Sequence, residues 1–214
     1  MARILITSGP TRQYLDPVRY LTNASSGRMG CSLAEVALEC GHQVTIVSGP
    51  VELSYPKAAK LIKVETTSEM LEVARDNFNN CDGLIGVAAP CDYQPVRISP
   101  QKIIKTGEPL ELHLVETPDI VASLADDKQH RWVVGFALET EDHRFRALMK
   151  LEAKSCDLII LNEIQAIGSL ENKVEIIGPH GEILACINGN KNRVASEIFC
   201  VIQRRLIDQQ TAKS

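Results

Sequence analysis

Apolar runs alternate with segments of helical periodicity through the first half of the chain. Four runs are too short for helices and are typical of strands buried in a sheet: 3–7, 43–47, 60–64 and 83–89. Between them, 27–41 and 68–78 repeat apolar residues at helical spacing, with Gly41 ending the first helix and Ser68 capping the second. This order predicts an α/β fold: a doubly wound, mostly parallel, Rossmann-like sheet with helices on both faces.

The second half continues the pattern less regularly. The expected elements are a half-solvated strand over 110–115, a helix from Pro118 to 124, strands over 132–137 and 158–161, and a helix over 141–154. An extra β-hairpin is expected from 174–177 and 182–187, which flank the turn 178–181. The last helix should bury one face and precede a frayed tail at 209–214; that face comprises Val194, Ile198, Val201, Ile202 and Leu206.

Two stretches follow neither period. We expect 12–24 to form a long functional loop and 93–108 a mobile flap, because both contain prolines and no regular apolar face. No shift in composition and no linker divides the chain. Residues 1–214 are therefore expected to form a single domain.

The loop 23–30 joins the first strand to the first helix and reads Asn-Ala-Ser-Ser-Gly-Arg-Met-Gly. A polar, glycine-bearing loop at the start of a helix presents backbone N–H groups at the positive end of the helix dipole, where an anion can bind. The alternative is an ordinary N-cap, in which Ser25 or Ser26 satisfies the first turn. The loop alone leaves both interpretations open.

Composition narrows the class of protein. The net charge of −4 over 214 residues gives no basic surface for nucleic acid. No apolar run approaches the roughly 18 residues of a membrane span, and the first strand leaves no room for a signal peptide. Seven cysteines without a CxxC pair argue against a disulfide framework or a zinc site and favour a cytoplasmic protein.

Ligands of a doubly wound sheet bind beyond the carboxyl ends of its strands. Lys150 and Lys154 share a helix face, and Lys102 and Lys105 lie in the expected flap, so these lysines suit a polyphosphate; a solvated surface lysine is the alternative for each. Asp92, also at a strand end, could reach a sugar hydroxyl or a metal, or could cap a turn.

No nucleophile with an adjacent base stands out among the serines, the cysteines and the five scattered histidines. A nicotinamide-binding domain is disfavoured because the first turn lacks GxGxxG. The second strand also ends in Ser48-Gly49-Pro50, without an acidic group for a ribose hydroxyl.

The chain resembles phosphopantothenoylcysteine synthetase of the bacterial, CTP-dependent type, which is often the second half of a bifunctional flavoprotein. The likeness extends from about residue 3 to 207, and its motifs occur in order at 9–12, 16–20, 23–30, 88–93, 102–105, 118–121 and 134–140. Two motifs depart from the usual pattern. Ile104 stands where the flap commonly has a lysine, and Pro90-Cys91 replaces the more common Val-Ala.

The resemblance implies an acid–amino-acid ligase of coenzyme A biosynthesis. Such an enzyme joins 4′-phosphopantothenate to L-cysteine through an acyl-cytidylate, consuming CTP with Mg²⁺ and releasing CMP and pyrophosphate. It also implies a homodimer and a separate phosphopantothenoylcysteine decarboxylase, with no nucleic acid or membrane partner. The alternatives are a catalytically silent nucleotide-binding regulatory module on the same fold and, with less support, an NAD(P)-linked oxidoreductase.

The resemblance also implies roles for single residues, while metal ligands stay unassigned. The implied catalytic residues are Asn23, which supports the acyl-cytidylate, and Lys102, which neutralises its charge. Nucleotide contacts are implied for Gly86, Val87, Ala88, Asp92, Lys102, Pro118, Asp119, Ile120, Val121, Phe136, Lys150 and Lys154. Substrate contacts are implied for Ser25, Gly27, Gly30, Phe136, Asn162 and, from the neighbouring subunit, Arg19.

Overall fold

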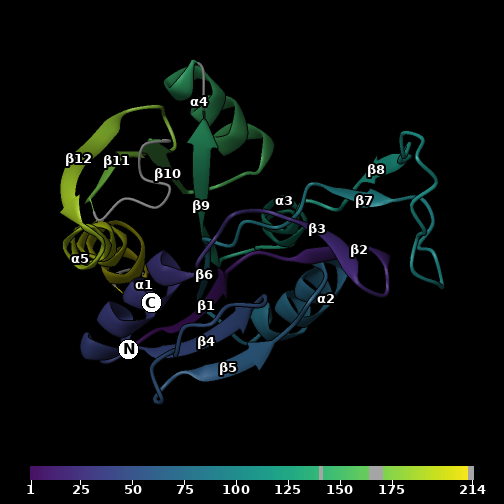
Figure 1. Cartoon of the computed structure of the whole chain (residues 1–214). Helices are drawn as coiled ribbons and strands as arrows, with labels where there is room; N and C mark the ends of the chain where they lie inside the picture. The colour runs from purple at the N-terminus through teal and green to yellow at the C-terminus, as the bar shows by residue number, and fades with distance from the viewer. Residues whose placement is uncertain (140–141, 164–170, 212–214) are drawn as a thin grey trace.

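The computed structural model describes residues 1–139, 142–163 and 171–211. Its centre is an eight-stranded sheet in the order β12-β11-β10-β9-β6-β1-β4-β5 (Figure 1). The strands are β1 (Arg3–Ser8), β4 (Gln43–Ser48), β5 (Lys60–Lys63), β6 (Gly83–Gly86), β9 (Trp132–Glu139), β10 (Leu158–Glu163), β11 (Glu171–Ile177) and β12 (Ile183–Asn190). The six strands that lie between β5 and β10 in the sheet, both included, pair in parallel. The strands β11 and β12 add the expected antiparallel hairpin.

Counted along the chain, the parallel strands lie in the order 3-2-1-4-5-6 of a Rossmann-like fold. The chain first moves from β1 to β4 and β5, and then returns to the other side of β1 with β6. The direction of winding therefore reverses between β1 and β6. In such sheets the reversal opens a crevice at the carboxyl ends of the two strands, where ligands bind.

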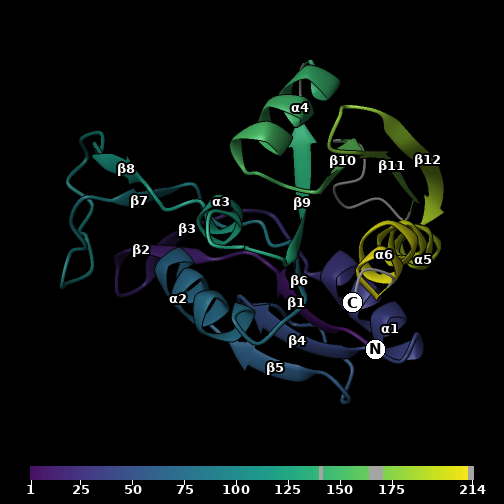
Figure 2. The ribbon, with the colours of Figure 1, turned by 180° about the vertical axis from the view of Figure 1, so that it is seen from behind.

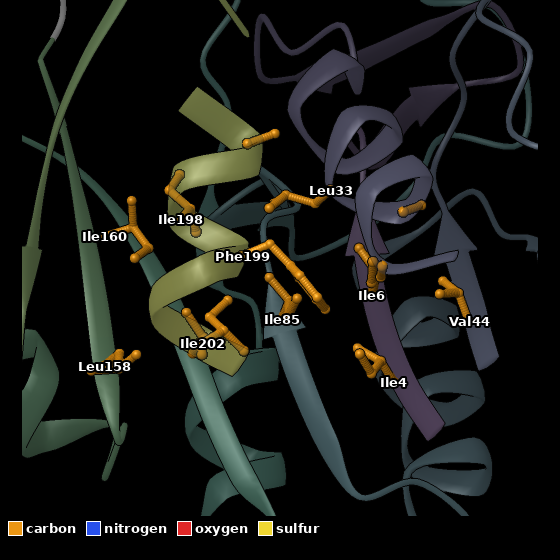
Figure 3. Packing of buried hydrophobic residues seen from close by; sticks show 14 of the residues in the cluster. Ile4, Ile6, Leu33, Val44, Ile85, Leu158, Ile160, Ile198, Phe199 and Ile202 are labelled. Atoms are coloured by element: carbon orange, nitrogen blue, oxygen red, sulfur yellow. The ribbon is translucent and has the colours of Figure 1, made fainter. Parts of the chain in front are cut away.

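Helices cover both faces of the sheet, as the sequence predicts (Figures 1 and 2). One face carries α1 (Arg28–Glu39), α5 (Lys191–Ile202), the π-helical segment η2 (Gln203–Ile207) and α6 (Asp208–Thr211). The other face carries α2 (Thr67–Phe78), α3 (Ile120–Ala125) and α4 (His143–Ala153). Figure 3 shows the first interface, where Leu33 and Phe199 pack with Ile85 of the sheet.

The expected apolar face of the last helix packs on the core, but only part of it is fully buried. Val194, Ile198 and Ile202 are buried, whereas Val201 and Leu206 are partly buried against the same core. The α-helix changes to the π-helical segment after Ile202, and α6 continues to Thr211. Residues 212–214 of the expected tail lie outside the described residues, as does residue 141 of the expected helix 141–154.

The predicted loop over 12–24 is wrong for most of its length. It contains an antiparallel hairpin of β2 (Arg12–Asp16) and β3 (Arg19–Thr22) outside the main sheet. The rings of Tyr14 and Tyr20 meet edge to face at 5.5 Å, and the Arg12 guanidinium lies 4.4 Å from the centre of the Tyr20 ring. The hairpin is held by such amphipathic contacts, which leave no apolar period in the sequence.

Two predicted helix starts are also corrected. Thr66, rather than Ser68, caps α2, and it forms a capping box with Glu69. Pro118 does not occupy the first helical position of α3. Asp119 is the N-cap there, and its side chain accepts a hydrogen bond from the Ala122 N–H, so the helix begins at Ile120.

The expected flap is part of an arm that projects from the body of the molecule (Figure 1). The short strands β7 (Tyr93–Pro95) and β8 (Leu114–Glu116) pair at its base. The expected strand over 110–115 is thus shorter and begins later. It is also more exposed than its alternating pattern suggests, because Leu114 and Val115 are both exposed.

Candidate functional site

Two loops meet above the reversal point between β1 and β6. The first leads from β1 through the hairpin to α1, and the second follows β6. The side-chain amide of Asn23 donates a hydrogen bond to the carbonyl of Pro90 over 2.8 Å, which joins the two loops directly. The residue predicted to be catalytic therefore lies in the crevice where this fold binds its ligands.

A set of threonine hydroxyls fixes the loop after β6. The Cys91 N–H donates to Thr11 Oγ1 at 2.8 Å, and the Cys91 carbonyl accepts from Thr67 Oγ1 at 3.2 Å and Thr117 Oγ1 at 2.7 Å. Sequence reasoning missed these threonines as a group, since they are far apart along the chain. Cys91 itself is buried, so these bonds anchor its loop to the body of the molecule.

The amino terminus of α1 has no side-chain cap, so the alternative with Ser25 or Ser26 as N-cap is wrong. The N-cap is Gly27, which adopts a left-handed conformation with φ of 71°. A serine that caps a helix has an extended backbone, whereas the residue at this N-cap is a left-handed glycine. In this fully described segment, the first N–H groups of α1 thus receive no side-chain partner and face the carboxyl edge of the sheet. That arrangement suits an anion.

Gly30 allows α1 to pack directly on the end of β1. A Cβ atom at Gly30 would lie 2.2 Å from Ser8 Oγ and 3.2 Å from Val87 Cγ1. Ser8 Oγ donates to the Gly27 carbonyl at 3.3 Å and accepts from the Tyr55 hydroxyl at 2.8 Å. Tyr55 comes from the loop after β4, and sequence reasoning gave no sign of its part in holding the Gly27 turn.

The predicted nucleotide residues on α3 and α4 are brought together. Lys154 Nζ lies 2.9 Å from Asp119 Oδ2, which ties the start of α3 to the end of α4. Burial alone would raise the pKa of Asp119, but hydrogen bonds from the Ala122 N–H and from Lys154 outweigh it, so the pKa is lowered. Lys150 lies one turn before Lys154 on α4.

One glycine explains how α3 reaches the crevice. A Cβ at Gly86 would lie 2.5 Å from Val121 Cγ2. The glycine at the end of β6 therefore lets α3 approach the strand closely. Val121, at the start of α3, thus lies beside the backbone of Gly86.

Phe136 and Asn162 lie on neighbouring strands near the same edge. Phe136 is opposite Ile160 in the β9–β10 register, and Asn162 is opposite Leu138, two residues further along. The Asn162 side-chain oxygen is buried and makes no hydrogen bond with the described residues. Buried polar atoms are rarely left unpaired, so this oxygen is a candidate ligand contact.

The remaining predicted residues lie on the arm or its base. Lys102, Lys105 and Asp92 are all exposed. The two flap lysines thus lie on a different element from Lys150 and Lys154. Arg19, predicted to act in a neighbouring subunit, contacts its own chain here: Nη1 lies 2.6 Å from Asp16 Oδ2 and donates to the Ile103 carbonyl at 3.0 Å.

These features define an α/β protein with a Rossmann-like sheet and a candidate anion site at the carboxyl edge. The crevice combines an uncapped helix start, an amide donor and backbone groups from the end of β6. Over the described ranges, no group of three or more His, Cys, Asp or Glu side chains could hold a metal ion. Over the same ranges, no helix is both long and apolar enough to span a bilayer.

Comparison with known proteins identifies the family. The chain belongs to the DFP family, described as the DNA/pantothenate metabolism flavoprotein C-terminal domain, which matches residues 1–206. It is 41% identical over 207 residues to the coenzyme A biosynthesis bifunctional protein CoaBC of Vibrio vulnificus, covering 94% of this chain and 51% of the relative. CoaBC of Escherichia coli K12 is 41% identical over 187 residues, covering 84% and 46%. The chain thus spans about half the length of these relatives.

Solved structures agree with this assignment and confirm the family expected from the sequence. The crystal structure of the C-terminal domain of CoaBC superposes with a TM-score of 0.82 at 35% identity, covering 96% of both chains. A mutant of Cab2 in complex with phosphopantothenate-cysteine has a TM-score of 0.80 at 19% identity, covering 99% of this chain and 89% of that one. At that identity the likeness supports the fold alone.

Proposed function

We propose that this protein is a phosphopantothenate–cysteine ligase that uses CTP. The observation that carries the proposal is the position of Asn23, which is hydrogen-bonded to the loop after β6 beside the uncapped start of α1. An amide donor beside a helix terminus that suits an anion, at the edge where such sheets bind ligands, supports the proposal. The family supports the proposal, because its full-length relatives carry names from coenzyme A biosynthesis.

The phosphate of 4′-phosphopantothenate would bind at the start of α1. The uncapped N–H groups next to Gly27 and Gly30 favour an anion there, and Ser25 lies in the same loop. The pantothenate carboxylate would then extend toward Asn23. Phe136 and the unpaired oxygen of Asn162 line the neighbouring strand ends and would contact the uncharged part of the substrate.

CTP would bind on the β6 side of the crevice. Gly86 ends β6, Val87 and Ala88 follow it, and Val121 packs beside Gly86. Lys150 and Lys154 supply positive charge from α4 for the triphosphate, and Asp119 holds Lys154 in place. Asp92 at the base of the arm is left to contact the ribose or the base.

Mg²⁺ would reach the site with the triphosphate. Phosphate oxygens and one or two carboxylates are the usual ligands of this ion, and it keeps several waters. Among the described residues, Asp119 and Asp92 are two carboxylates on the segments proposed to hold the nucleotide, which fits such partial coordination rather than a complete protein cage. The ion would neutralise charge on the triphosphate.

The reaction has two steps. A carboxylate oxygen of phosphopantothenate attacks the α-phosphorus of CTP, the bond to the bridging oxygen breaks, and pyrophosphate leaves. The cysteine amine then attacks the carbonyl of the acyl-cytidylate, the acyl–oxygen bond breaks, and CMP leaves while the amine loses a proton. Asn23 would donate to the oxyanion that forms at the carbonyl, and Lys102 would offset charge on the cytidylate.

The active form would be a homodimer. Arg19 would reach the neighbouring site, and only its Nη1 is engaged in the contacts with Asp16 and Ile103. The arm also exposes several large apolar residues, including Val96, Ile98, Ile104 and Leu110. A second copy of the chain would remove this apolar surface from water. A phosphopantothenoylcysteine decarboxylase would consume the product.

Pyrophosphate release tests the proposal. Purified protein with CTP, Mg²⁺ and phosphopantothenate should release pyrophosphate, and adding cysteine should make the release continuous. Replacing CTP by ATP should reduce the rate strongly. A catalytically silent nucleotide-binding module would release none under any of these conditions, and that result would overturn the proposal.

Asn23→Asp should separate the two steps. A carboxylate cannot donate to the oxyanion or to the Pro90 carbonyl, so the second step should slow by about 10²–10³-fold, as for the loss of an oxyanion donor. The acyl-cytidylate should then accumulate and be detectable by mass spectrometry after acid quenching. Ser26→Ala, at an exposed position of the same loop, is the matched control and should turn over normally. Normal turnover in Asn23→Asp would remove the proposed role.

A further inference from the structure

Asp16 is a carboxylate whose side chain is fully buried at the tip of the β2–β3 hairpin. Oδ1 accepts from the N–H groups of Val18 and Arg19, each at 2.8 Å. Oδ2 accepts from Arg19 Nη1 at 2.6 Å and from the Ile103 N–H at 3.0 Å. The carboxylate is thus shared between the hairpin and the arm, and its four donors satisfy a charge that would otherwise be costly to bury.

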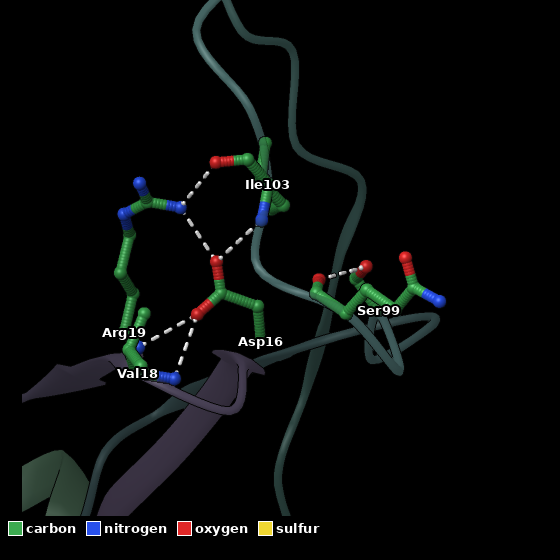
Figure 4. Close-up of polar contacts among 6 residues, drawn as sticks. Asp16, Val18, Arg19, Ser99 and Ile103 are labelled. Atoms are coloured by element: carbon green, nitrogen blue, oxygen red, sulfur yellow. Dashed lines mark hydrogen bonds and ion pairs between the residues drawn. The ribbon is translucent and has the colours of Figure 1, made fainter.

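The contact with the arm is made twice. Arg19 Nη1 also donates to the Ile103 carbonyl at 3.0 Å, so both backbone groups of Ile103 are bonded to the Asp16–Arg19 pair (Figure 4). Nearby, the Ser99 N–H donates to the Leu15 carbonyl at 2.9 Å. These bonds hold the arm against the hairpin at the residue that follows Lys102.

We propose that Asp16 is a positioning residue that fixes the arm at Ile103 and thereby sets the position of Lys102 over the nucleotide. Asp16 does not itself touch the reacting groups. It acts through the backbone of the arm, and its effect on catalysis rests on the proposed function. Without this carboxylate, the arm populates other positions, and CTP binds only to the fraction of molecules with Lys102 in place.

Burial alone would raise the pKa of Asp16, but the hydrogen bonds from Ile103, Val18 and Arg19 and the charge of Arg19 lower it. The carboxylate is therefore ionised throughout the neutral range. The bonds of Asp16 and Arg19 to Ile103, called the latch below, persist there. An amide at this position differs in kind. It offers a single acceptor oxygen, and its NH₂ group would face two of the four donors.

Two variants break the latch from opposite sides. Asp16→Asn removes acceptors on the hairpin, and Ile103→Pro removes the donor N–H on the arm without altering the buried carboxylate. Two controls match them. Asp157→Asn changes a carboxylate that also accepts a backbone N–H and a basic side chain, from Val133 and Lys128, but lies at the start of β10. Glu111→Pro places a proline at another exposed position of the arm, away from Ile103.

The first measurement needs no substrate. Tryptic cleavage after Lys105 should be faster in Asp16→Asn and Ile103→Pro than in the wild type and both controls. The second measurement is kinetic. The KM for CTP should rise about tenfold in both latch variants, the effect of losing one hydrogen bond to a charged group. The KM for cysteine should stay unchanged, and the controls should keep the wild-type KM for CTP.

Wild-type cleavage rates in both latch variants would overturn the latch. Faster cleavage with an unchanged KM for CTP would overturn the positioning role. If Asp16→Asn fails to fold by circular dichroism, Ile103→Pro still decides the outcome. If the wild type itself releases no pyrophosphate, the proposed function fails, whereas the cleavage experiment still reports whether Asp16 holds the arm.

Discussion

At the residue scale, Gly30 shows why a small side chain is required in the predicted substrate loop. It lies inside α1, where alanine normally favours the helix by roughly 0.5–1 kcal/mol over glycine. Here the added Cβ would meet Ser8 Oγ at 2.2 Å and Ser8 Cβ at 2.7 Å, much closer than van der Waals contact. The glycine is therefore explained by packing between helix and strand, in addition to any contact with phosphate.

Gly30→Ala should destabilise the protein despite its better helix propensity. Forcing α1 away from β1 is overpacking of a buried contact, which typically costs about 1–3 kcal/mol. Urea unfolding followed by circular dichroism measures the loss. Ser8→Gly in the Gly30→Ala background removes both clashing atoms and should restore part of the stability. A stabilised single variant would show that the packing is looser than described.

At the element scale, the start of α3 combines a structural and a binding role in Asp119. The side chain caps the helix through the Ala122 N–H and pairs with Lys154. Asp119→Ala should lose the cap and about 1 kcal/mol of stability. Asp119→Asn should keep the cap, since asparagine is an equally good N-cap, but lose the charge that orients Lys154. Equal destabilisation of both variants in urea unfolding would contradict the capping role.

Apolar periodicity predicted the parallel sheet and its helices because each buries a continuous face. It failed for the β2–β3 hairpin, whose strands pair outside the sheet. There Arg12, Tyr14 and Tyr20 contact one another through side chains that are part polar and part apolar. The predicted cap of α2 was two residues too late in the chain. Ser68 and Thr66 are both residue types that cap helices, and only the capping box with Glu69 distinguishes them.

Site residues could be predicted only where they lie together in one stretch of the sequence. Asn23 and Gly27 lie in one recognisable stretch, so their loop could be selected from the sequence. Thr11, Thr67 and Thr117 converge on Cys91 from three separate segments, and no local pattern marks such a cluster. The bond between Asp16 and Ile103 spans 87 positions and was missed for the same reason.

At the scale of the whole molecule, the arm is the strongest indication of a partner copy. Val96 and Ile98 are 56% and 61% exposed on an element that projects from the body. Val96→Glu with Ile98→Glu should shift a dimer toward monomer in sedimentation velocity. Phe145→Glu with Met149→Glu is the matched control, because these residues are 66% and 52% exposed on α4, away from the arm. Dissociation by both pairs alike would refute the arm as the interface.

The reversal between β1 and β6 organises the rest of the molecule. It brings the loop of Asn23 and the loop of Pro90 to one crevice, with α1 on one side and α3 with α4 on the other. Two anionic ligands can thus approach from opposite sides. We propose that they react through an acyl-cytidylate formed between them.

Transfer of ¹⁸O from the carboxylate to CMP tests for this intermediate. Phosphopantothenate labelled in its carboxylate should be incubated with CTP, Mg²⁺, cysteine and the protein, and the products analysed by mass spectrometry. We expect each CMP to carry one ¹⁸O atom, because the attacking carboxylate oxygen leaves with CMP. Unlabelled CMP, or label in inorganic phosphate, would contradict it.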